Sequence, residues 1–167
     1  MRYVWLCGHS VIFAALAGFL CMGACQAQTH VLRFNMLEGG VFTGTGGQGY
    51  RCEILQKLHR FEDLYREIHG NRLPAPPIPE VDFQRYAVLF FSLDARPTAG
   101  YSVDVEKVVQ NGNRLDVQLK ITEPPQDSIQ AQVMTRPFVM VTVEQFSGVQ
   151  KVRFLGFGFT PLCESVW

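Results

Sequence analysis

The chain has 167 residues, with 15 basic and 15 acidic side chains and a formal net charge of zero at pH 7. This length suits one ordinary domain preceded by a removable leader, and 47% hydrophobic residues suffice for a real core. Because the charge is balanced and no run of Lys or Arg occurs, nucleic acid and anionic membrane surfaces are excluded as expected partners.

Residues 1–27 have the pattern of an export signal. An almost wholly apolar run from Val11 to Leu20 follows a single early charge, and small residues come next. The run is shorter than the roughly 20 residues that a membrane span needs. Two cleavage sites stay open: Met22-Gly23-Ala24-Cys25 resembles a lipobox with lipid attachment at Cys25, and ordinary cleavage would follow Ala27. Both predict export to the bacterial cell envelope, with membrane contact only through a lipid at Cys25.

The folded part contains two cysteines, Cys52 and Cys163. Export implies an oxidising compartment in which a disulfide persists. Lipidation of Cys25 would leave these two as an even pair. A bridge between them would close a long loop and stabilise the fold by about 4 kcal/mol in the chain-entropy model. Two buried free thiols are the alternative.

Residues 28–58 alternate strand-like and glycine-rich segments. Residues 31–37 predict a first strand, and residues 50–55 predict either a second strand or the approach to a helix. The glycine-rich stretch 39–49 between them predicts a flexible loop. Its end, Gly44 to Gly49, has the letters G-x-G-x-x-G, but a dinucleotide site needs a helix directly after this turn, and strand-like residues follow instead. We therefore expect no cofactor.

The clearest local prediction is a helix over residues 59–69. Its apolar side chains are spaced at i, i+3, i+4 and i+7 and form one stripe: Phe61, Leu64, Tyr65 and Ile68. We expect Gly70 to stop the helix and the four prolines of residues 73–79 to form an extended connector. His59 and His69 flank the helix too far apart to share an ion, so we place both at the surface or the helix end and expect no metal site.

The second half of the chain consists of strands joined by turns. Five strands are predicted: residues 86–93, 101–110, 114–121, 138–143 and 148–155. The first and fourth are continuous apolar runs, typical of central strands. Asn111-Gly112-Asn113 predicts a hairpin turn, and acidic residues such as Asp116 fall on polar strand faces where solvent accounts for them. The strands and the helix predict a single α+β domain over residues 28–167: a mainly antiparallel sheet or sandwich of about six to seven strands with one packed helix.

The most specific segment is the turn from Asp94 to Val103, with the sequence D-A-R-P-T-A-G-Y-S-V. Pro97 and Gly100 shape the turn, while Arg96, Thr98 and Tyr101 are side chains of the exposed type. This composition suits a recognition loop better than an active site. The chain has no G-x-S-x-G elbow and no cysteine in a known nucleophile signature, so we expect a protein that is not an enzyme.

This turn, the apolar run before it and the segment T-R-P-F-V-M-V from Thr135 to Val141 resemble the C-terminal domain of the PrcB family of protease-complex subunits. The resemblance covers residues 50–143 and is most specific at 96–103, with Ala95 and Ala99 in place of residues more frequent in the family. It implies an exported, non-enzymatic accessory or stabilising partner of a protease, such as a subtilisin-like one.

On this basis we place a partner-binding surface on the turn, with Thr135 and Arg136 nearby; its residues are Arg96, Thr98, Gly100 and Tyr101. Two alternatives stay open. The segment from Arg96 to Tyr101 is also similar to the N-P-T-T-G-Y loop of chagasin-type cysteine-protease inhibitors, immunoglobulin-like sandwiches whose loop blocks a protease cleft. The other alternative is that the turn serves folding alone, in an envelope domain of purely structural role.

Overall fold

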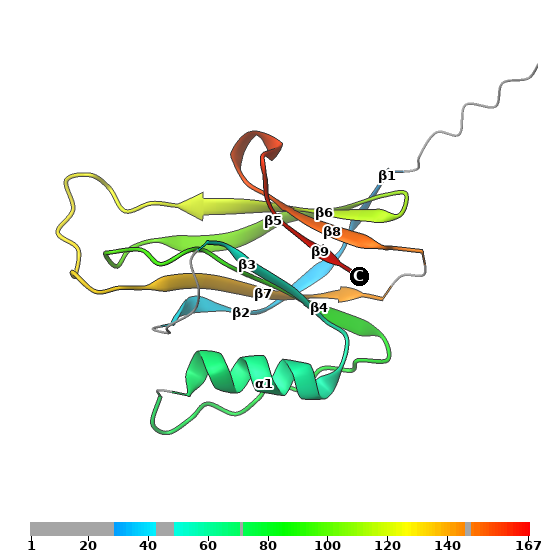
Figure 1. Ribbon diagram of the computed structural model, residues 1–167, viewed down its shortest axis with the longest axis horizontal. Helices are drawn as coiled ribbons and strands as arrows, with labels where there is room; N and C mark the ends of the chain where they lie inside the picture. Colours follow the sequence, from blue (N-terminus) through cyan, green and yellow to red (C-terminus); the bar gives the residue numbers. More distant parts are fainter. Residues whose placement is uncertain (1–28, 43–48, 71, 146–147) are drawn as a thin grey trace, which may run out of the picture.

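The computed structural model describes residues 29–42, 49–70, 72–145 and 148–167, which form a β-sandwich with a helix packed on one outer face (Figure 1). Residues 1–28, which contain the predicted leader and Cys25, and most of the G-x-G-x-x-G segment lie outside the described residues. The described part contains nine strands and one α-helix, so the α+β sandwich is confirmed and the expected number of strands is too low.

Each sheet has a simple order of neighbouring strands. The larger sheet has the order β1 (Thr29–Leu32), β5 (Ser102–Asn111), β6 (Arg114–Thr122), β8 (Lys151–Leu155) and β9 (Pro161–Val166). The smaller sheet has the order β2 (Phe34–Phe42), β7 (Arg136–Glu144), β4 (Tyr86–Ser92) and β3 (Arg51–Leu55). The β6–β8 pair is parallel, and the other described pairs are antiparallel.

The central strands β4 and β7 are buried on both faces, as their continuous apolar sequences predict. In β4, Leu89 and Phe91 face the larger sheet, while Val88 and Phe90 face α1 (Leu58–His69). Side chains on a strand point alternately to opposite faces. A strand between two apolar layers is therefore apolar at most of its positions. The smaller sheet is therefore the middle layer of the molecule, with the larger sheet on one side and α1 on the other (Figure 1).

The helix α1 buries the predicted apolar stripe against the smaller sheet and ends at His69, with Gly70 as its C-cap. Its last residue, His69, lies at the helix end, one of the two predicted places, but it is not at the surface. His69 is 2% exposed, and its Nε2 lies 3.1 Å from Oε1 of Glu38 on β2. The reason is the periodicity of the helix: His69 lies four residues after Tyr65, on the face that packs on the sheet.

The predicted first strand is in fact two strands in different sheets. β1 pairs with β5, the chain crosses between the sheets at Arg33, and β2 pairs with β7. Gly39 and Gly40, predicted to start a flexible loop, lie in β2, where they pair with Val139 and Phe138. Tertiary pairing against the apolar strand β7 overrides the low strand propensity of glycine here.

The hairpin of β5 and β6 follows the prediction, with Gly112 at a φ of +60° in a connection of two residues. A bulge between Val105 and Lys107 adds one residue to β5. The extra residue restores the inward direction for Val108, which is fully buried. Strict alternation from Val105 would have directed Lys107 inward instead.

The strand β9 was not predicted. It is a short edge strand that begins at Pro161 and is only half buried, so it lacks both the continuous apolar run and the clean alternation that identify a strand in a sequence. It extends the larger sheet beyond β8.

Candidate partner-binding surface

The turn between β4 and β5 is braced by the segment that precedes β7. The backbones of Arg96 and Thr135 form a two-way bridge: Arg96 N–H donates to the Thr135 carbonyl at 2.8 Å, and Thr135 N–H donates to the Arg96 carbonyl at 2.9 Å. The Thr135 hydroxyl donates to the Thr98 carbonyl at 3.1 Å, and Ala99 N–H donates to the Ala131 carbonyl at 3.0 Å. The turn therefore continues the pairing of the sheet and does not project freely.

The burial of the predicted site residues follows from this bracing. Arg96, Thr98 and Tyr101 are half buried, so the expectation of an exposed recognition loop is only partly met. Thr135 and Arg136 do lie beside the turn, but they are 5% and 3% exposed and are not available to a partner. Thr135 is bridged to Arg96 of the turn, and Arg136 is the first residue of β7, where it pairs with Phe42 of β2.

Gly100 is required by the fold. Its φ is +94°, in the left-handed region, and a Cβ built on it would lie 2.7 Å from Gln130 Oε1 and 2.9 Å from Pro124 Cβ. Residues 124–130 cross over the turn at this point, and only glycine leaves room for them. Gly100 is thus a packing residue, although its backbone is exposed.

The Arg96 side chain is partly exposed and contacts two neighbours, Tyr101 and Asp94. Its guanidinium lies 5.1 Å from the centre of the Tyr101 ring, and its Nη2 lies 3.1 Å from Asp94 Oδ1. The Arg96 side chain is 24% exposed and that of Asp94 is 40% exposed. A cation over an aromatic face at such a position contributes roughly 0.5–1 kcal/mol and holds the guanidinium in place.

A comparison with protein families matches residues 87–144 to the family described as PrcB C-terminal. The resemblance seen in the sequence is thereby confirmed for this segment, which runs from β4 to the end of β7 and contains the whole braced turn. No curated protein and no solved structure matches the chain.

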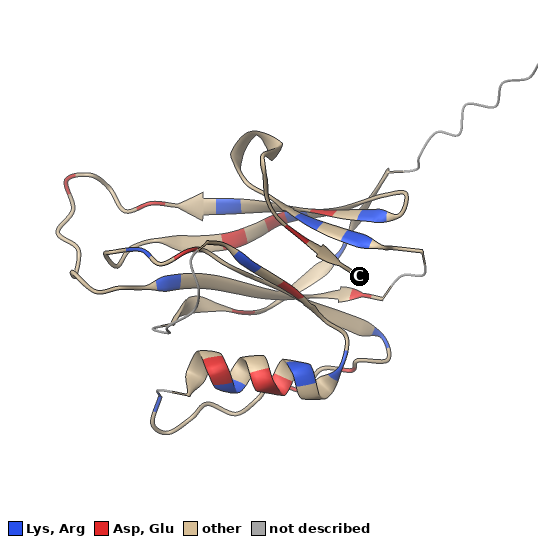
Figure 2. Cartoon of the chain, in the orientation of Figure 1, with Lys and Arg blue, Asp and Glu red and all other residues tan. Residues whose placement is uncertain are grey.

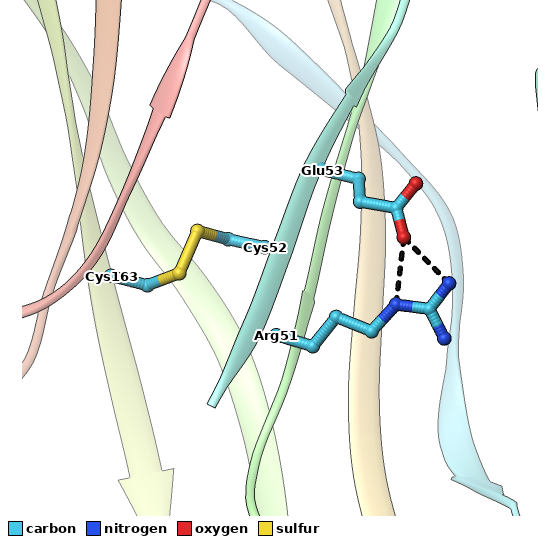
Figure 3. The surroundings of a disulfide bond; sticks show 4 residues. All are labelled: Arg51, Cys52, Glu53 and Cys163. Atoms are coloured by element: carbon cyan, nitrogen blue, oxygen red, sulfur yellow. Dashed lines mark hydrogen bonds and ion pairs between the residues drawn. A yellow bond between two sulfur atoms is a disulfide. The ribbon is translucent and has the colours of Figure 1, made fainter. Parts of the chain in front are cut away.

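Outside the PrcB segment, a disulfide joins the edges of the two sheets. Cys52 on β3 is bonded to Cys163 on β9, with their Cα atoms 6.2 Å apart (Figure 3). Arg51 and Glu53, which flank Cys52, point to the other side of β3, and the Arg51 guanidinium also pairs with Glu67 of α1 at 2.6 Å. β3 is therefore tied to the opposite sheet on one face and to the helix on the other.

A polar network covers the outer face of the larger sheet. Asp116 on β6 accepts hydrogen bonds from Asn111 Nδ2 at 2.7 Å, Arg114 Nε at 3.0 Å and Arg153 Nε at 2.9 Å. Burial raises the pKa of the Asp116 carboxyl, but the donors on Arg153, Asn111 and Arg114 outweigh it, and the pKa is lower than usual. Asp116 is only 9% exposed, against the prediction of a solvated strand face.

Basic and acidic residues lie interspersed along the strands in Figure 2. In the described part of the chain, no three or more His, Cys, Asp and Glu side chains are grouped so that they could hold a metal ion. None of the described helices is long and apolar enough to cross a membrane.

The sequence reasoning missed one conspicuous surface feature. The turn between β8 and β9 contains a short 3-10 helix, Phe157–Phe159, whose two phenylalanines are exposed to solvent. We call residues 156–160 the aromatic tip. The available signal was two phenylalanines separated and preceded by glycine, in a segment that lacks the alternation of a strand or the period of a helix.

Proposed function

We propose that this protein is an exported, non-enzymatic protein-binding domain that acts as an accessory or stabilising subunit of a protease in the bacterial cell envelope. The observation that carries the proposal is the PrcB match, which spans the two central strands of one sheet and the hairpin of the other. We propose further that residues 1–27 direct export and that Cys25 bears the lipid.

The surface chemistry of the braced turn supports protein binding. Arg and Tyr are enriched among residues that contribute most to protein interfaces, and here Arg96 is held over Tyr101 beside Asp94. A side chain that is already ordered loses less conformational entropy when a partner binds. The group suits a partner surface that offers a carboxylate to Arg96 and an apolar patch to the Tyr101 ring.

The same geometry does not favour a chagasin-like inhibitor. A loop that blocks a protease cleft has to enter it, whereas the Thr98 carbonyl and the Ala99 N–H are already hydrogen-bonded to residues of the bracing segment. Separating the turn from that segment would break these bonds and the Arg96–Thr135 bridge. We therefore retain the accessory subunit as the proposed function.

A pull-down from envelope extract tests the proposal. Full-length protein with a C-terminal tag, expressed in its native cell, should enrich a subtilisin-like protease, and deletion of the gene should reduce the amount of that protease. Arg96→Ala combined with Tyr101→Ala should weaken the enrichment, because both side chains of the exposed group are removed. Arg60→Ala, which removes an arginine from the helix on the other side of the smaller sheet, is the matched control. If the wild-type protein enriches no protease, the proposed function is wrong.

A further inference from the structure

The aromatic tip exposes more apolar ring surface than any packing role requires. Phe157 is 100% exposed and Phe159 is 67% exposed, so neither ring contributes appreciably to the core. Soluble proteins carry scattered exposed apolar residues, but two aromatic rings on one turn form a patch. The tip lies outside the PrcB segment and projects beyond the sheet between β8 and β9 (Figure 1).

The tip is a rigid turn, because its backbone is hydrogen-bonded internally. Gly156 N–H donates to the Thr160 carbonyl at 2.8 Å, and Phe159 N–H donates to the Gly156 carbonyl at 3.1 Å. Gly158 and Phe159 have φ values of +66° and +61°, as at the two central positions of a type I′ turn. A phenylalanine in the left-handed region is unusual, and asparagine or glycine would satisfy this backbone better. Phe159 thus occupies a position where its ring disfavours the fold.

The charges around the tip argue against a lipid surface as the ligand. The sequence from Phe154 to Cys163 contains no charged residue. On β8, Lys151 pairs with Glu164 at 2.9 Å and Arg153 with Asp116 at 2.9 Å, so both cations are engaged by acids. Loops and helices that bind anionic lipid combine apolar side chains with basic ones, and this tip has no such collar among the described residues.

The size of the tip argues against a second copy of the chain. A buried phenylalanine removes roughly 150–250 Å² from water, so a tip-to-tip contact would bury at most about 500 Å² on each copy. Stable protein interfaces bury about 800 Å² on each partner. The tip is therefore large enough for the centre of an interface with a pocket on another protein, but too small for a symmetric dimer by itself.

We propose that Phe157 and Phe159 are an aromatic anchor that inserts into an apolar pocket on the protease subunit. The inference rests on the proposed function and adds to it the surface that makes the main contact. Interface anchors are aromatic side chains that fill pockets at the centre of the contact, and a rigid turn presents its rings at little entropic cost. Since neither ring is packed in the core, their replacement should leave the fold intact.

The test compares Phe157→Ser combined with Phe159→Ser against Ile129→Ser in the pull-down described above. Ile129 is also fully exposed but lies on the segment that braces the other turn, so it controls for the loss of exposed apolar surface. We expect the double variant to lose about tenfold or more of the captured protease, with an unchanged melting temperature, while Ile129→Ser captures as the wild type does.

Each outcome decides the inference. Protease captured equally by the double variant and the wild type would overturn the anchor and leave the proposed function standing. No protease captured by the wild type would overturn both. Two further measurements compare the purified wild-type protein with the purified double variant and address the two alternatives, a lipid surface and a second copy of the chain. The first measures association with vesicles of phosphatidylethanolamine and phosphatidylglycerol, and the second measures dimerisation by size-exclusion chromatography. If the wild-type protein binds vesicles or dimerises and the double variant does not, the tip binds lipid or a second copy, and the inference is overturned.

Discussion

Two turns of the sandwich are built in opposite ways. The turn from Asp94 to Tyr101 carries the PrcB motif, yet its backbone is bonded to the neighbouring segment and its glycine is enclosed by Pro124 and Gln130. The aromatic tip lies outside the family match, yet both of its rings face solvent. The turn inside the family match is thus fixed largely by its packing, and the two exposed aromatic rings lie outside the match.

The contrast teaches that a motif and a binding surface need not coincide. At Gly100 the surrounding atoms and the positive φ permit only glycine, so the fold itself requires this residue. At Phe159 the side chain disfavours the backbone conformation that the residue adopts, so the fold does not explain the phenylalanine, whereas the proposed binding of a partner does.

Removing the disulfide should have the largest effect on stability. It closes a separation of 111 residues, and the chain-entropy model gives a loss of about 4–5 kcal/mol in the free energy of unfolding for Cys52→Ser combined with Cys163→Ser. Because Cys163 lies on β9, amide hydrogen exchange should accelerate more at residues 151–166 than at residues 94–101. Equal acceleration in both regions would show that loss of the disulfide loosens the braced turn as much as the aromatic tip. Reduced wild-type protein should behave like the double variant.

A substitution at Gly100 in the braced turn should have the second largest effect on stability. Gly100→Ala adds a Cβ at 2.7 Å from Gln130 Oε1 at a φ of +94°, so we expect urea denaturation to show a loss of about 2–3 kcal/mol from strain and displacement together. Gly112→Ala is the matched control, since its φ of +60° carries the strain but no atom lies within 4 Å of the new Cβ. It should lose only about 1 kcal/mol. Equal losses would show that the bracing segment yields easily.

The polar network around Asp116 should make stability depend on acid. Asp116 has a lowered pKa in the folded protein, so its contribution is complete above the unfolded pKa of about 3.9 and is lost as the pH falls through the folded value. Asp116→Asn should cost about 1–2 kcal/mol at pH 7 and flatten this dependence. Unfolding curves measured from pH 7 to pH 2 compare the two proteins. An unchanged acid slope in the variant would show that other carboxyls control it.

The smallest effect should have the opposite sign. Phe159→Gly relieves the left-handed strain at a φ of +61°, and we expect it to raise the free energy of unfolding by about 1 kcal/mol. Phe157→Gly lacks this gain, because Phe157 does not have a positive φ, and it should leave stability unchanged or slightly lower. Differential scanning calorimetry measures both. A destabilised Phe159→Gly would mean that the ring supports the turn and is not held there for a partner.

Much of this fold was predictable because the central strands and the helix have strong periodicity. The alternation in β5 and β6, the apolar runs of β4 and β7 and the stripe of α1 all follow from which faces are buried. The split of the first strand at Arg33 was not predictable, since it depends on pairing with two different sheets. Neither was β9, whose register is held by its neighbour β8 and by Cys163.

The candidate site was predictable only in part. The composition of the turn identified Arg96 and Tyr101, and the structure brings their side chains together. The burial of Thr135 and of Arg136 accompanies their pairing with Arg96 and Phe42, which lie far away in the sequence, and no local pattern indicates it. The burial of His69 and of Asp116 was missed for a similar reason, because their partners Glu38 and Arg153 lie on distant segments of the chain.

Two covalent links join the two sheets, one at each margin of the sandwich. At one margin the chain itself passes between the sheets at Arg33, and at the other the bond between Cys52 and Cys163 joins them. The second link needs β9, the last strand in chain order. A chain interrupted before that strand would carry an unreacted thiol at the rim of the smaller sheet. The bond therefore distinguishes a chain that contains β9 chemically from one that lacks it.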